Sequence, residues 1–336
     1  MRVLVTGASG FIGAALVELL RGRGAIGPRP IESLILLDQR LPQEAPGVLS
    51  IEGDLGDRHV LARIAELAPE VCFHLAAVPG GAAEADAALS RRVNLDATLD
   101  LFDALAGARA AKDSPGPQRP VVVYASTIAV YGGALPDPVS DATPARPLMT
   151  YGAHKLACEV LLRDYTRRGL LDGRSLRLPG IVARPRTSSG LVSAFMSEVL
   201  HALRAGESVS VPVGPAATAW WMSARRCAQN LLHAAAMEVG DTLGAPGPRA
   251  WPMPVLRLSM ADVVRTLSQV YAVDGDQLVR YAPQPSVEAV FGRYPRLDDS
   301  AARALGMRDD GSATALVRRA LEAEFEDLAV DDPVWR

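Results

Sequence analysis

Residues 2–13 read RVLVTGASGFIG, a run of β-branched residues and leucine that breaks at Gly7 and continues at once into a helical pattern. Three glycines occupy the break and the start of that pattern. Gly7 permits a tight turn after a strand, and Gly10 lets a bound group approach the backbone closely. Gly13 allows a helix to pack directly on a strand. The stretch therefore predicts a β-strand, a tight turn and an α-helix in direct succession.

The alternation of strands and helices continues outward from this stretch. Continuous apolar runs are typical of strands buried on both faces, and they predict further strands at residues 34–37, 48–51, 71–75, 121–124 and 175–178. Helical patterns lie between them, at residues 59–67, 85–106 and 151–167, and a loop is expected at 112–120. Strands that alternate with helices at this spacing predict an α/β fold built on a doubly wound parallel (Rossmann) sheet.

The turn after the first strand has the features of a phosphate-binding loop. The N-terminus of the following helix would present free N–H groups and a positive dipole end to a pyrophosphate. Asp38 closes the second strand, where an acidic residue binds the ribose hydroxyls of adenosine; the alternative is an ordinary turn residue. Its carboxylate would repel a 2′-phosphate, which favours NAD over NADP, and Arg40 could offset that repulsion.

Tyr151 and Lys155 are spaced i, i+4, so their side chains share one face of a helix. A free phenol, with a pKa of about 10, is a poor base at neutral pH. A neighbouring ammonium group and the positive nicotinamide would stabilise the phenolate. Tyr151 is then expected to take a hydroxyl proton while hydride leaves the same carbon. In an arbitrary protein this spacing is usually a solvated helix face.

Three polar residues could assist such a reaction. Ser126 and Thr127 follow the fifth predicted strand, where a hydroxyl can orient and polarise a substrate oxygen. Asn94 lies within a predicted helix, where asparagine is unfavourable, so we expect it to have a polar role; the alternative is a simple exposed position. We expect the catalytic residues to be Tyr151, Lys155, Thr127, Ser126 and Asn94.

The composition excludes several classes of protein. The 336 residues include 38 acidic and 35 basic side chains, which give a net charge of -3 without any basic block. That balance argues against binding to nucleic acid, and no apolar run approaches the roughly 20 residues that span a bilayer. Cys72, Cys158 and Cys227 form neither a disulfide framework nor a metal-ligand spacing. We expect a cytoplasmic protein that binds no metal.

Taken together, the motifs resemble the extended short-chain dehydrogenase/reductase family, which includes NAD-dependent epimerases and dehydratases. The resemblance rests on TGASGFIG at 6–13, HLAA at 74–77, VNLD at 93–96, STIAVYG at 126–132 and YGAHK at 151–155. It implies that Tyr151 is the acid/base, that Lys155 binds the nicotinamide ribose and that Thr127 orients the substrate. It also implies a structural His74 and a homodimer formed through the long helices after the fourth and fifth strands.

The resemblance and the strand positions together give the set of cofactor-binding residues. Asp54 is either a partner of the adenine amino group or a helix cap. The NAD-binding residues expected are Gly7, Ser9, Gly10, Phe11, Ile12, Gly13, Asp38, Gln39, Arg40, Asp54, Leu55, Leu75, Ala76, Ala77, Asn94, Tyr151, Lys155, Pro179, Ile181 and Val182.

Beyond residue 180 the alternation of strands and helices stops. Short helices are expected at 191–203, 224–237, 260–271 and 313–324, separated by loops rich in proline and glycine such as 244–254. We therefore expect residues 1–180 to form an NAD-binding domain that carries the catalytic residues. Residues 181–336 are expected to form a smaller, mixed C-terminal substrate lobe, some segments of which return to the first domain.

The second half bears on the substrate. Nucleotide-sugar enzymes of this family usually carry an RDFVHVD-like segment, whereas residues 220–227 read WWMSARRC and lack its acidic and histidine positions. The runs at 165–174 and 177–185 look closer to a narrower branch, the D-erythronate dehydrogenases, which oxidise a four-carbon sugar acid at C2 with NAD. The alternative is a nucleotide-sugar epimerase or dehydratase; a regulatory relative is disfavoured by the intact Tyr151 and Lys155.

A sugar acid requires a cation for its carboxylate, which arginine binds through two parallel hydrogen bonds. Arg184 is the first candidate and Arg225 the second, and the alternative for each is a surface arginine. Trp220 and Trp221 either wall the pocket or belong to the core. Gly80 and Gly81 either let the backbone approach the substrate or form a simple loop. The substrate-binding residues expected are Ser126, Thr127, Tyr151, Arg184, Gly80, Gly81, Trp221 and Arg225.

Overall fold

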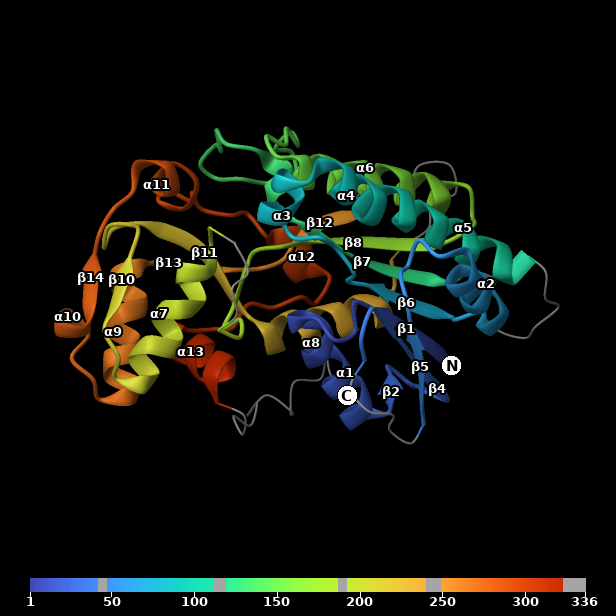
Figure 1. Cartoon of the computed structure of the whole chain (residues 1–336), viewed down its shortest axis with the longest axis horizontal. Coiled ribbons are helices and arrows are strands. Elements are labelled where there is room, and N and C mark those ends of the chain that lie inside the picture. The colour runs from blue at the N-terminus through green and yellow to red at the C-terminus, as the bar shows by residue number, and fades with distance from the viewer. Residues whose placement is uncertain (42–46, 111–118, 187–191, 240–248, 323–336) are drawn as a thin grey trace. The chain divides into compact units, whose positions relative to one another are not determined.

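The computed structural model describes residues 1–41, 47–110, 119–186, 192–239 and 249–322 (Figure 1). The chain forms two compact units. The first takes in Met1–Val130, Ala145–Arg177 and Ala228–Trp251. The second takes in Tyr131–Pro144, Leu178–Cys227 and the described part of Pro252–Arg336. Each unit therefore contains segments from both halves of the sequence.

A seven-stranded sheet is the centre of the first unit. Its strand order is β12-β8-β7-β6-β1-β4-β5. The strands are β1 (Arg2–Thr6), β4 (Ser33–Asp38), β5 (Val48–Glu52), β6 (Val71–His74), β7 (Val121–Thr127), β8 (Asp172–Leu178) and β12 (Ala250–Pro252). Strand β1 pairs in parallel with both β4 and β6, and the pairs β4–β5 and β6–β7 are parallel too. The predicted doubly wound parallel sheet is confirmed, and its order reverses beside β1, where ligands bind in such folds.

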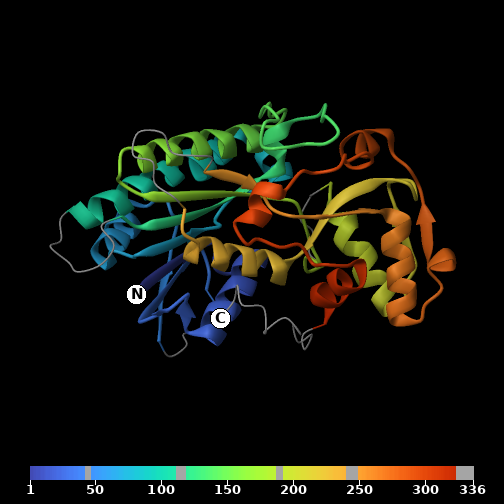
Figure 2. The same cartoon turned by 180° about the vertical axis from the view of Figure 1, so that it is seen from behind.

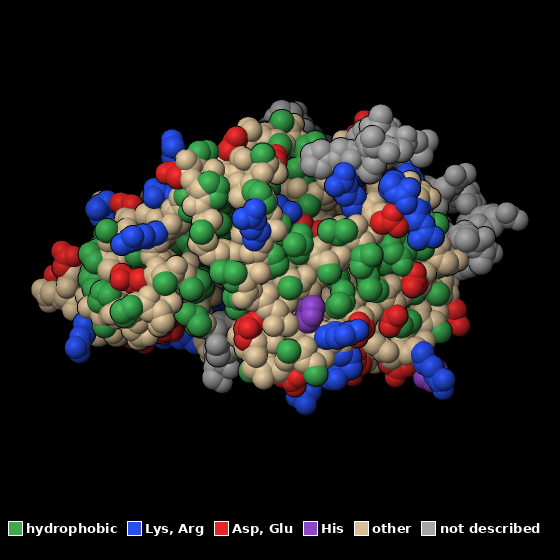
Figure 3. Space-filling model, turned by 90° about the horizontal axis from the view of Figure 1, so that it is seen from above, with side chains coloured by type: hydrophobic (Ala, Val, Ile, Leu, Met, Phe, Trp, Pro, Cys, Tyr) green, Lys and Arg blue, Asp and Glu red, His purple; other side chains and the backbone are tan. Residues whose placement is uncertain are grey.

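Helices cover both faces of this sheet. Figure 1 shows α5 (Ala97–Ala110) and α6 (Thr150–Arg167) over one face, and α1 (Phe11–Arg23) and α8 (Ala224–Ala236) over the other. Figure 2 shows the same two layers from behind. Helix α2 (Arg58–Leu67) packs with α5 and α6, because their buried apolar side chains share one core with the sheet. Figure 3 looks down on the side of the first unit that α6 covers. Val160 on this helix is 61% exposed.

The segment from residue 80 to residue 110 differs from the prediction of a loop followed by one helix over 85–106. It consists of α3 (Gly80–Ala85), α4 (Ala87–Ser90), a π-helix (Arg91–Asp96) and then α5. Asp86 separates the first two helices with φ −138°, and its carboxylate caps α4 by accepting from the Leu89 N–H. The prediction was wrong here because apolar periodicity records neither a local cap nor a widened turn. Gly80 and Gly81 accordingly begin a helix.

The other predicted elements of the first unit match within a few residues. Strand β8 starts at Asp172, three residues earlier than expected, and Asp172 is held there by ion pairs to Arg174 and Arg249. A short hairpin of β2 (Ala25–Ile26) and β3 (Arg29–Pro30) follows α1. Residues 112–118 and 244–248 of the two expected loops lie outside the described residues, and residues 250–252, expected in the second loop, form strand β12 instead.

The second unit has a smaller sheet and its own core. Strand β11 (Thr218–Ser223) pairs in parallel with β9 (Gly180–Val182) and antiparallel with β13 (Leu256–Ser259), while β10 (Val209–Val211) pairs with β14 (Val279–Tyr281). The helices around them are α7 (Ala194–Ala205), α9 (Met260–Tyr271), α10 (Gly275–Leu278), α11 (Pro285–Phe291), α12 (Ser300–Ala304) and α13 (Ala313–Leu321). The structure confirms the start and the end of the helix predicted at 260–271. Leu191, the first residue of the helix predicted at 191–203, and residues 323–324 of the helix predicted at 313–324 lie outside the described part.

Two tryptophans lie in this second unit and are almost fully buried. Trp220 and Trp221 are each 1% exposed. The Trp220 Nε1–H donates to the Pro295 carbonyl at 2.8 Å, and the Trp221 Nε1–H donates to the Leu258 carbonyl at 3.3 Å. A buried indole whose N–H is satisfied by the backbone is a core residue. The structure thus gives both residues the core role that the sequence left open.

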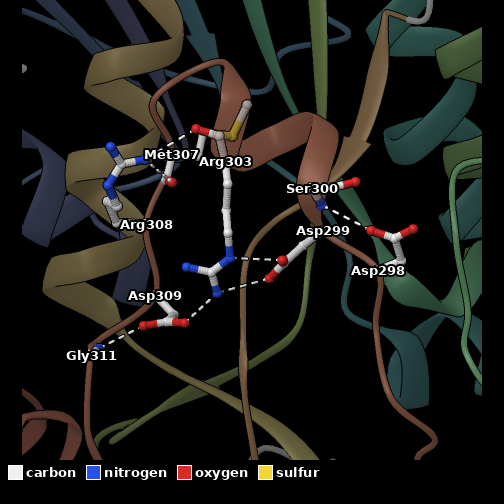
Figure 4. A network of polar contacts seen from close by, with 8 residues as sticks. All are labelled: Asp298, Asp299, Ser300, Arg303, Met307, Arg308, Asp309 and Gly311. Atoms are coloured by element: carbon white, nitrogen blue, oxygen red, sulfur yellow. Dashed lines mark hydrogen bonds and ion pairs between the residues drawn. The ribbon is translucent and has the colours of Figure 1, made fainter.

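A network of charged side chains orders the segment around residues 298–311 (Figure 4). The Arg303 guanidinium donates to both carboxylate oxygens of Asp299, at 2.7 and 3.0 Å, and also to Asp309. These hydrogen bonds raise the pKa of Arg303 above its usual range. The next residue, Asp310, is buried and accepts from the Ser223 N–H at 2.9 Å and the Ser223 hydroxyl at 2.7 Å. A carboxylate from elsewhere in the chain therefore anchors the end of β11.

Candidate active site

The turn between β1 and α1 has no room for a side chain at Gly7 or Gly13. Gly7 has φ +70°, and a Cβ there would lie 2.6 Å from the Ala76 nitrogen. A Cβ on Gly13 would lie 2.0 Å from the Gly7 carbonyl oxygen. Helix α1 starts after Gly10 with no side-chain cap and no acidic residue in its first turn. An uncapped positive helix end in a tight glycine cradle fits a pyrophosphate.

The acidic residue after β4 lies beside this turn. Asp38 accepts from the Ser9 N–H at 2.9 Å and from the Gln39 N–H at 2.7 Å. The Ser9 hydroxyl donates to the Arg40 carbonyl at 2.6 Å. These contacts join the end of β4 to the glycine turn, where the adenosine half of a dinucleotide would lie. The preference for NAD over NADP remains a prediction.

Asp54 makes a local turn in the described structure. Its carboxylate accepts from the Gly56 N–H at 2.8 Å, whereas Asp57 caps α2 by accepting from the His59 N–H. The helix-cap role that the sequence left open for Asp54 therefore belongs to Asp57. Leu55 beside it is buried in the core of the first unit.

Lys155 lies in the second turn of α6, and its side chain is buried. It is 1% exposed, and its ammonium donates to the Ala125 carbonyl of β7 at 2.8 Å. The Nζ atom lies 5.8 Å from the centre of the Tyr151 ring and 4.7 Å from that of Tyr124. Burial lowers the pKa of Lys155 to about 8, and Cys158 and Glu159 act against that decrease. The predicted pairing of Tyr151 with Lys155 on one helix face is present.

The two neighbouring hydroxyls of β7 have different partners. The Ser126 hydroxyl donates to the Glu159 carboxylate on α6. The Thr127 hydroxyl accepts from the Ala129 N–H at 3.1 Å and keeps its own proton to donate. Successive side chains of a strand point to opposite faces, so the two hydroxyls are directed to opposite sides of the sheet. The roles of Ser126 and Thr127 toward a substrate remain predictions.

Asn94 occupies the π-helix and is bonded to the loop that follows β6. Its Oδ1 accepts from the Val78 N–H at 2.7 Å, and its Nδ2 donates to the Val78 carbonyl at 2.9 Å. Nδ2 also lies 3.2 Å from the Ser90 hydroxyl. The amide therefore pairs with a backbone peptide as a neighbouring strand would. Asn94 therefore has a polar role, which is to hold the loop after β6 in place.

His74 completes the link between this loop and the sheet. The Thr98 hydroxyl donates to the Asn94 carbonyl at 3.1 Å, so it accepts from His74 Nε2, 2.9 Å away. His74 Nδ1 then accepts from the Thr6 hydroxyl at 2.7 Å. Burial, aided by the charge of Lys155, lowers the pKa of His74 to about 3. A permanently neutral histidine is a structural residue here.

We predict that Asn94→Ala destabilises the protein by about 1–3 kcal/mol, because both polar groups of Val78 lose their partner. Asp86→Ala, which removes only the cap of α4 in the same segment, should cost about 1 kcal/mol or less. Urea unfolding of both variants measures the difference. Equal losses of unfolding free energy in the two variants would show that the hydrogen bonds of Asn94 to Val78 do not hold the loop in place.

The remaining predicted site residues divide between the two units. Ala76 donates its N–H to the Thr6 hydroxyl at 3.3 Å, next to Gly7. A Cβ on Gly80 would lie 3.9 Å from the Tyr151 ring, so Gly80 lies close to that ring. Pro179, Ile181, Val182, Trp221, Arg184 and Arg225 belong to the second unit. Arg184 is fixed through its backbone, which donates to the Ser197 hydroxyl and accepts from His201. The roles of Arg184 and Arg225 toward a carboxylate remain predictions.

Two residues near Lys155 were missed by the sequence interpretation. Glu159 follows Lys155 by four residues, so helical spacing alone would have placed it on the same buried face. Gly152 lets the first turn of α6 approach the chain after β7, since a Cβ there would lie 2.5 Å from the Ala129 carbonyl oxygen.

Within the described ranges, no helix is both long and apolar enough to cross a membrane.

Comparison with known proteins finds a family model and relatives that match most of the chain. The sequence model of the NAD dependent epimerase/dehydratase family matches residues 3–240. D-erythronate dehydrogenase of Cupriavidus necator is 35% identical over 329 residues, which cover 96% of this chain and 98% of that protein. D-erythronate dehydrogenase of Haemophilus influenzae is 29% identical, with 97% and 100% covered.

A solved structure extends the similarity to three dimensions. The nucleoside-diphosphate-sugar epimerase from Agrobacterium tumefaciens superimposes with a TM-score of 0.88 at 33% sequence identity. The match covers 96% of this chain and 94% of that one. Both the similarity of sequence and the similarity of structure therefore extend over both units.

Proposed function

The chain belongs to the NAD dependent epimerase/dehydratase family, and on that premise we propose that it oxidises the C2 hydroxyl of a small sugar acid, with D-erythronate as the first candidate. The class of enzyme is an NAD-dependent dehydrogenase, and its product would be the corresponding 2-oxo acid. The single observation that supports the chemistry most is the buried Lys155 beside Tyr151. The choice of D-erythronate is supported by the two full-length relatives of that name.

The residues of the first unit would divide the reaction between them. The glycine turn and the start of α1 would hold the pyrophosphate of NAD, and Asp38 would bind the adenosine ribose. Bound NAD supplies the acceptor for the hydride that leaves C2. Tyr151 would take the proton of the C2 hydroxyl, Thr127 would orient that hydroxyl, and the ammonium of Lys155 would stabilise the phenolate and bind the nicotinamide ribose.

The second candidate function is a nucleotide-sugar epimerase or dehydratase that retains its NAD. The structural similarity to the epimerase from Agrobacterium tumefaciens favours it. The sequence WWMSARRC at 220–227 argues against it, because no acidic residue or histidine is present in that segment. Asp310 reaches the segment, but it is bound to Ser223 and to Arg319.

We predict that a panel of four-carbon to six-carbon sugar acids, assayed with NAD, contains a substrate whose oxidation releases NADH, detected by its absorbance. D-Erythronate should give the highest kcat/KM. A panel of nucleotide-sugars is the matched alternative, and it should give no NADH and no epimer. Turnover of a nucleotide-sugar together with inertness toward every sugar acid would refute the proposal.

Two further expectations stay predictions. The homodimer is supported by the exposed Val160 and Leu161 on α6, one of the two helices through which the family resemblance places it (Figure 3). Light scattering of the purified protein tests it. The cytoplasmic location rests on the sequence alone.

A further inference from the structure

A buried ion pair lies one helical turn along α6 from Lys155. The Glu159 carboxylate, 5% exposed, is bound by the Arg177 guanidinium of β8 through Nε at 3.0 Å and Nη2 at 2.7 Å. The same carboxylate accepts the hydroxyl proton of Ser126. Removing two charges from water is costly, and a pair survives in such a place only with close geometry and further hydrogen bonds. Glu159 has both.

Two side chains of α6 make hydrogen bonds to successive residues of β7. Lys155 and Glu159 are one helical turn apart, and they bind the consecutive residues Ala125 and Ser126. The next residue along β7 is Thr127, the proposed substrate contact. The hydrogen bond to Glu159 therefore fixes β7 between the residue that binds Lys155 and Thr127. Arg177 holds Glu159 from the neighbouring strand β8.

The charged and titratable groups that face Lys155 come from three elements. Helix α6 contributes Tyr151, Cys158 and Glu159; the Cys158 thiol, when ionised, and the Glu159 carboxylate raise the pKa of Lys155. Strand β7 contributes the Tyr124 ring, and β6 contributes His74, which is neutral. The thiol of Cys158 is itself buried, and its pKa is raised, so it carries no charge near neutral pH. Glu159 is therefore the anion of this set.

We propose that Glu159 is a positioning residue for the reaction: its carboxylate, held by Arg177, fixes the end of β7 through Ser126 and provides the negative charge that keeps the buried ammonium of Lys155 protonated. This inference rests on the proposed function, since it takes Lys155 as the residue that supports Tyr151. Ser126 belongs to this support and does not touch the substrate.

The first test compares the pH dependence of kcat for the wild type and Glu159→Gln. Glutamine still accepts from Ser126 but has no charge. At an effective dielectric constant of about 20, losing the charge lowers the pKa of Lys155 by about one unit or more. A one-unit shift from about 8 reduces kcat about tenfold at pH 9 and only about twofold at pH 7. KM for the substrate should stay within about threefold, because Ser126 does not contact it.

The second test does not depend on turnover. The folded protein binds the proton of Lys155 less tightly than the unfolded chain does, so this residue adds stability progressively as the pH rises from about 8 toward the ordinary lysine pKa of 10.5. The contribution is isolated as the difference in unfolding free energy between a protein and its Lys155→Met counterpart at each pH. In the Glu159→Gln background this rise should begin about one pH unit lower.

Asp172→Asn is the matched control, because it also breaks partly buried ion pairs, which join Asp172 of β8 to Arg174 and Arg249. It should destabilise the protein without moving either pH curve. If Glu159→Gln does not fold, Glu159→Gln/Arg177→Gln removes both charges and should shift the curves in the same direction but by less, because losing the Arg177 cation partly offsets the loss of the anion. Curves that coincide with those of the wild type would overturn the inference. A shifted stability curve without any sugar-acid turnover would uphold it and reject only the proposed function.

Discussion

Tyr151→Phe is expected to lower kcat for sugar-acid oxidation by about 10²- to 10⁴-fold, the range that a general acid or base contributes. The substitution removes one hydroxyl and keeps the ring beside Lys155, whose Nζ lies 5.8 Å from its centre. Binding of NAD should change little, because Lys155 and the glycine turn are untouched. Steady-state kinetics and calorimetric titration with NAD measure the two effects separately.

Tyr165→Phe is the matched control for this experiment. Tyr165 lies on the same helix, α6, and its hydroxyl donates to Asp103 on α5. It is 14 residues from Tyr151, roughly 21 Å along a helix, and so cannot reach the reacting atoms. Its kcat should stay within about twofold of the wild type. Comparable losses in the two variants would mean that removing any tyrosine hydroxyl from α6 disturbs the helix, and that Tyr151 is not the acid/base.

Gly13→Ala is expected to cost about 3 kcal/mol of unfolding free energy and to weaken NAD binding at least about tenfold. The new Cβ would lie 2.0 Å from the Gly7 carbonyl oxygen and 2.9 Å from its carbon. Backbone atoms cannot turn aside as the end of a flexible side chain can. Either α1 moves away from the turn or the turn changes shape, and both displace the N–H groups that would bind the pyrophosphate.

Gly22→Ala on the same helix is expected to raise the unfolding free energy. A Cβ at Gly22 meets no atom within 4 Å, so alanine should gain up to about 1 kcal/mol from its higher helix propensity. Urea unfolding and NAD titration of the two variants make the comparison. If Gly13→Ala were as stable as Gly22→Ala and bound NAD normally, the close packing of α1 on the turn would not matter to the cofactor.

Much of the sheet was predictable because its signals are local. Strands β1, β4, β6 and β7 contain continuous apolar runs, and the break at Gly7 marks the turn where the order of strands reverses. Helix α6 was predictable for the same reason, and with it the shared face of Tyr151 and Lys155. The segmentation at residues 80–96 was not, because it depends on the cap at Asp86 and on the bonds between Asn94 and Val78.

The sequence by itself determined the class of fold, the glycine cradle and the pairing of Tyr151 with Lys155, since all three depend on residues close together in the chain. Only the tertiary structure decided how the two hydroxyls of β7 are used. Ser126 and Glu159 are 33 residues apart, and Arg177 is 18 residues further on. A hydrogen bond over that separation depends on which face of β7 meets α6, and strand alternation then turns Thr127 the other way.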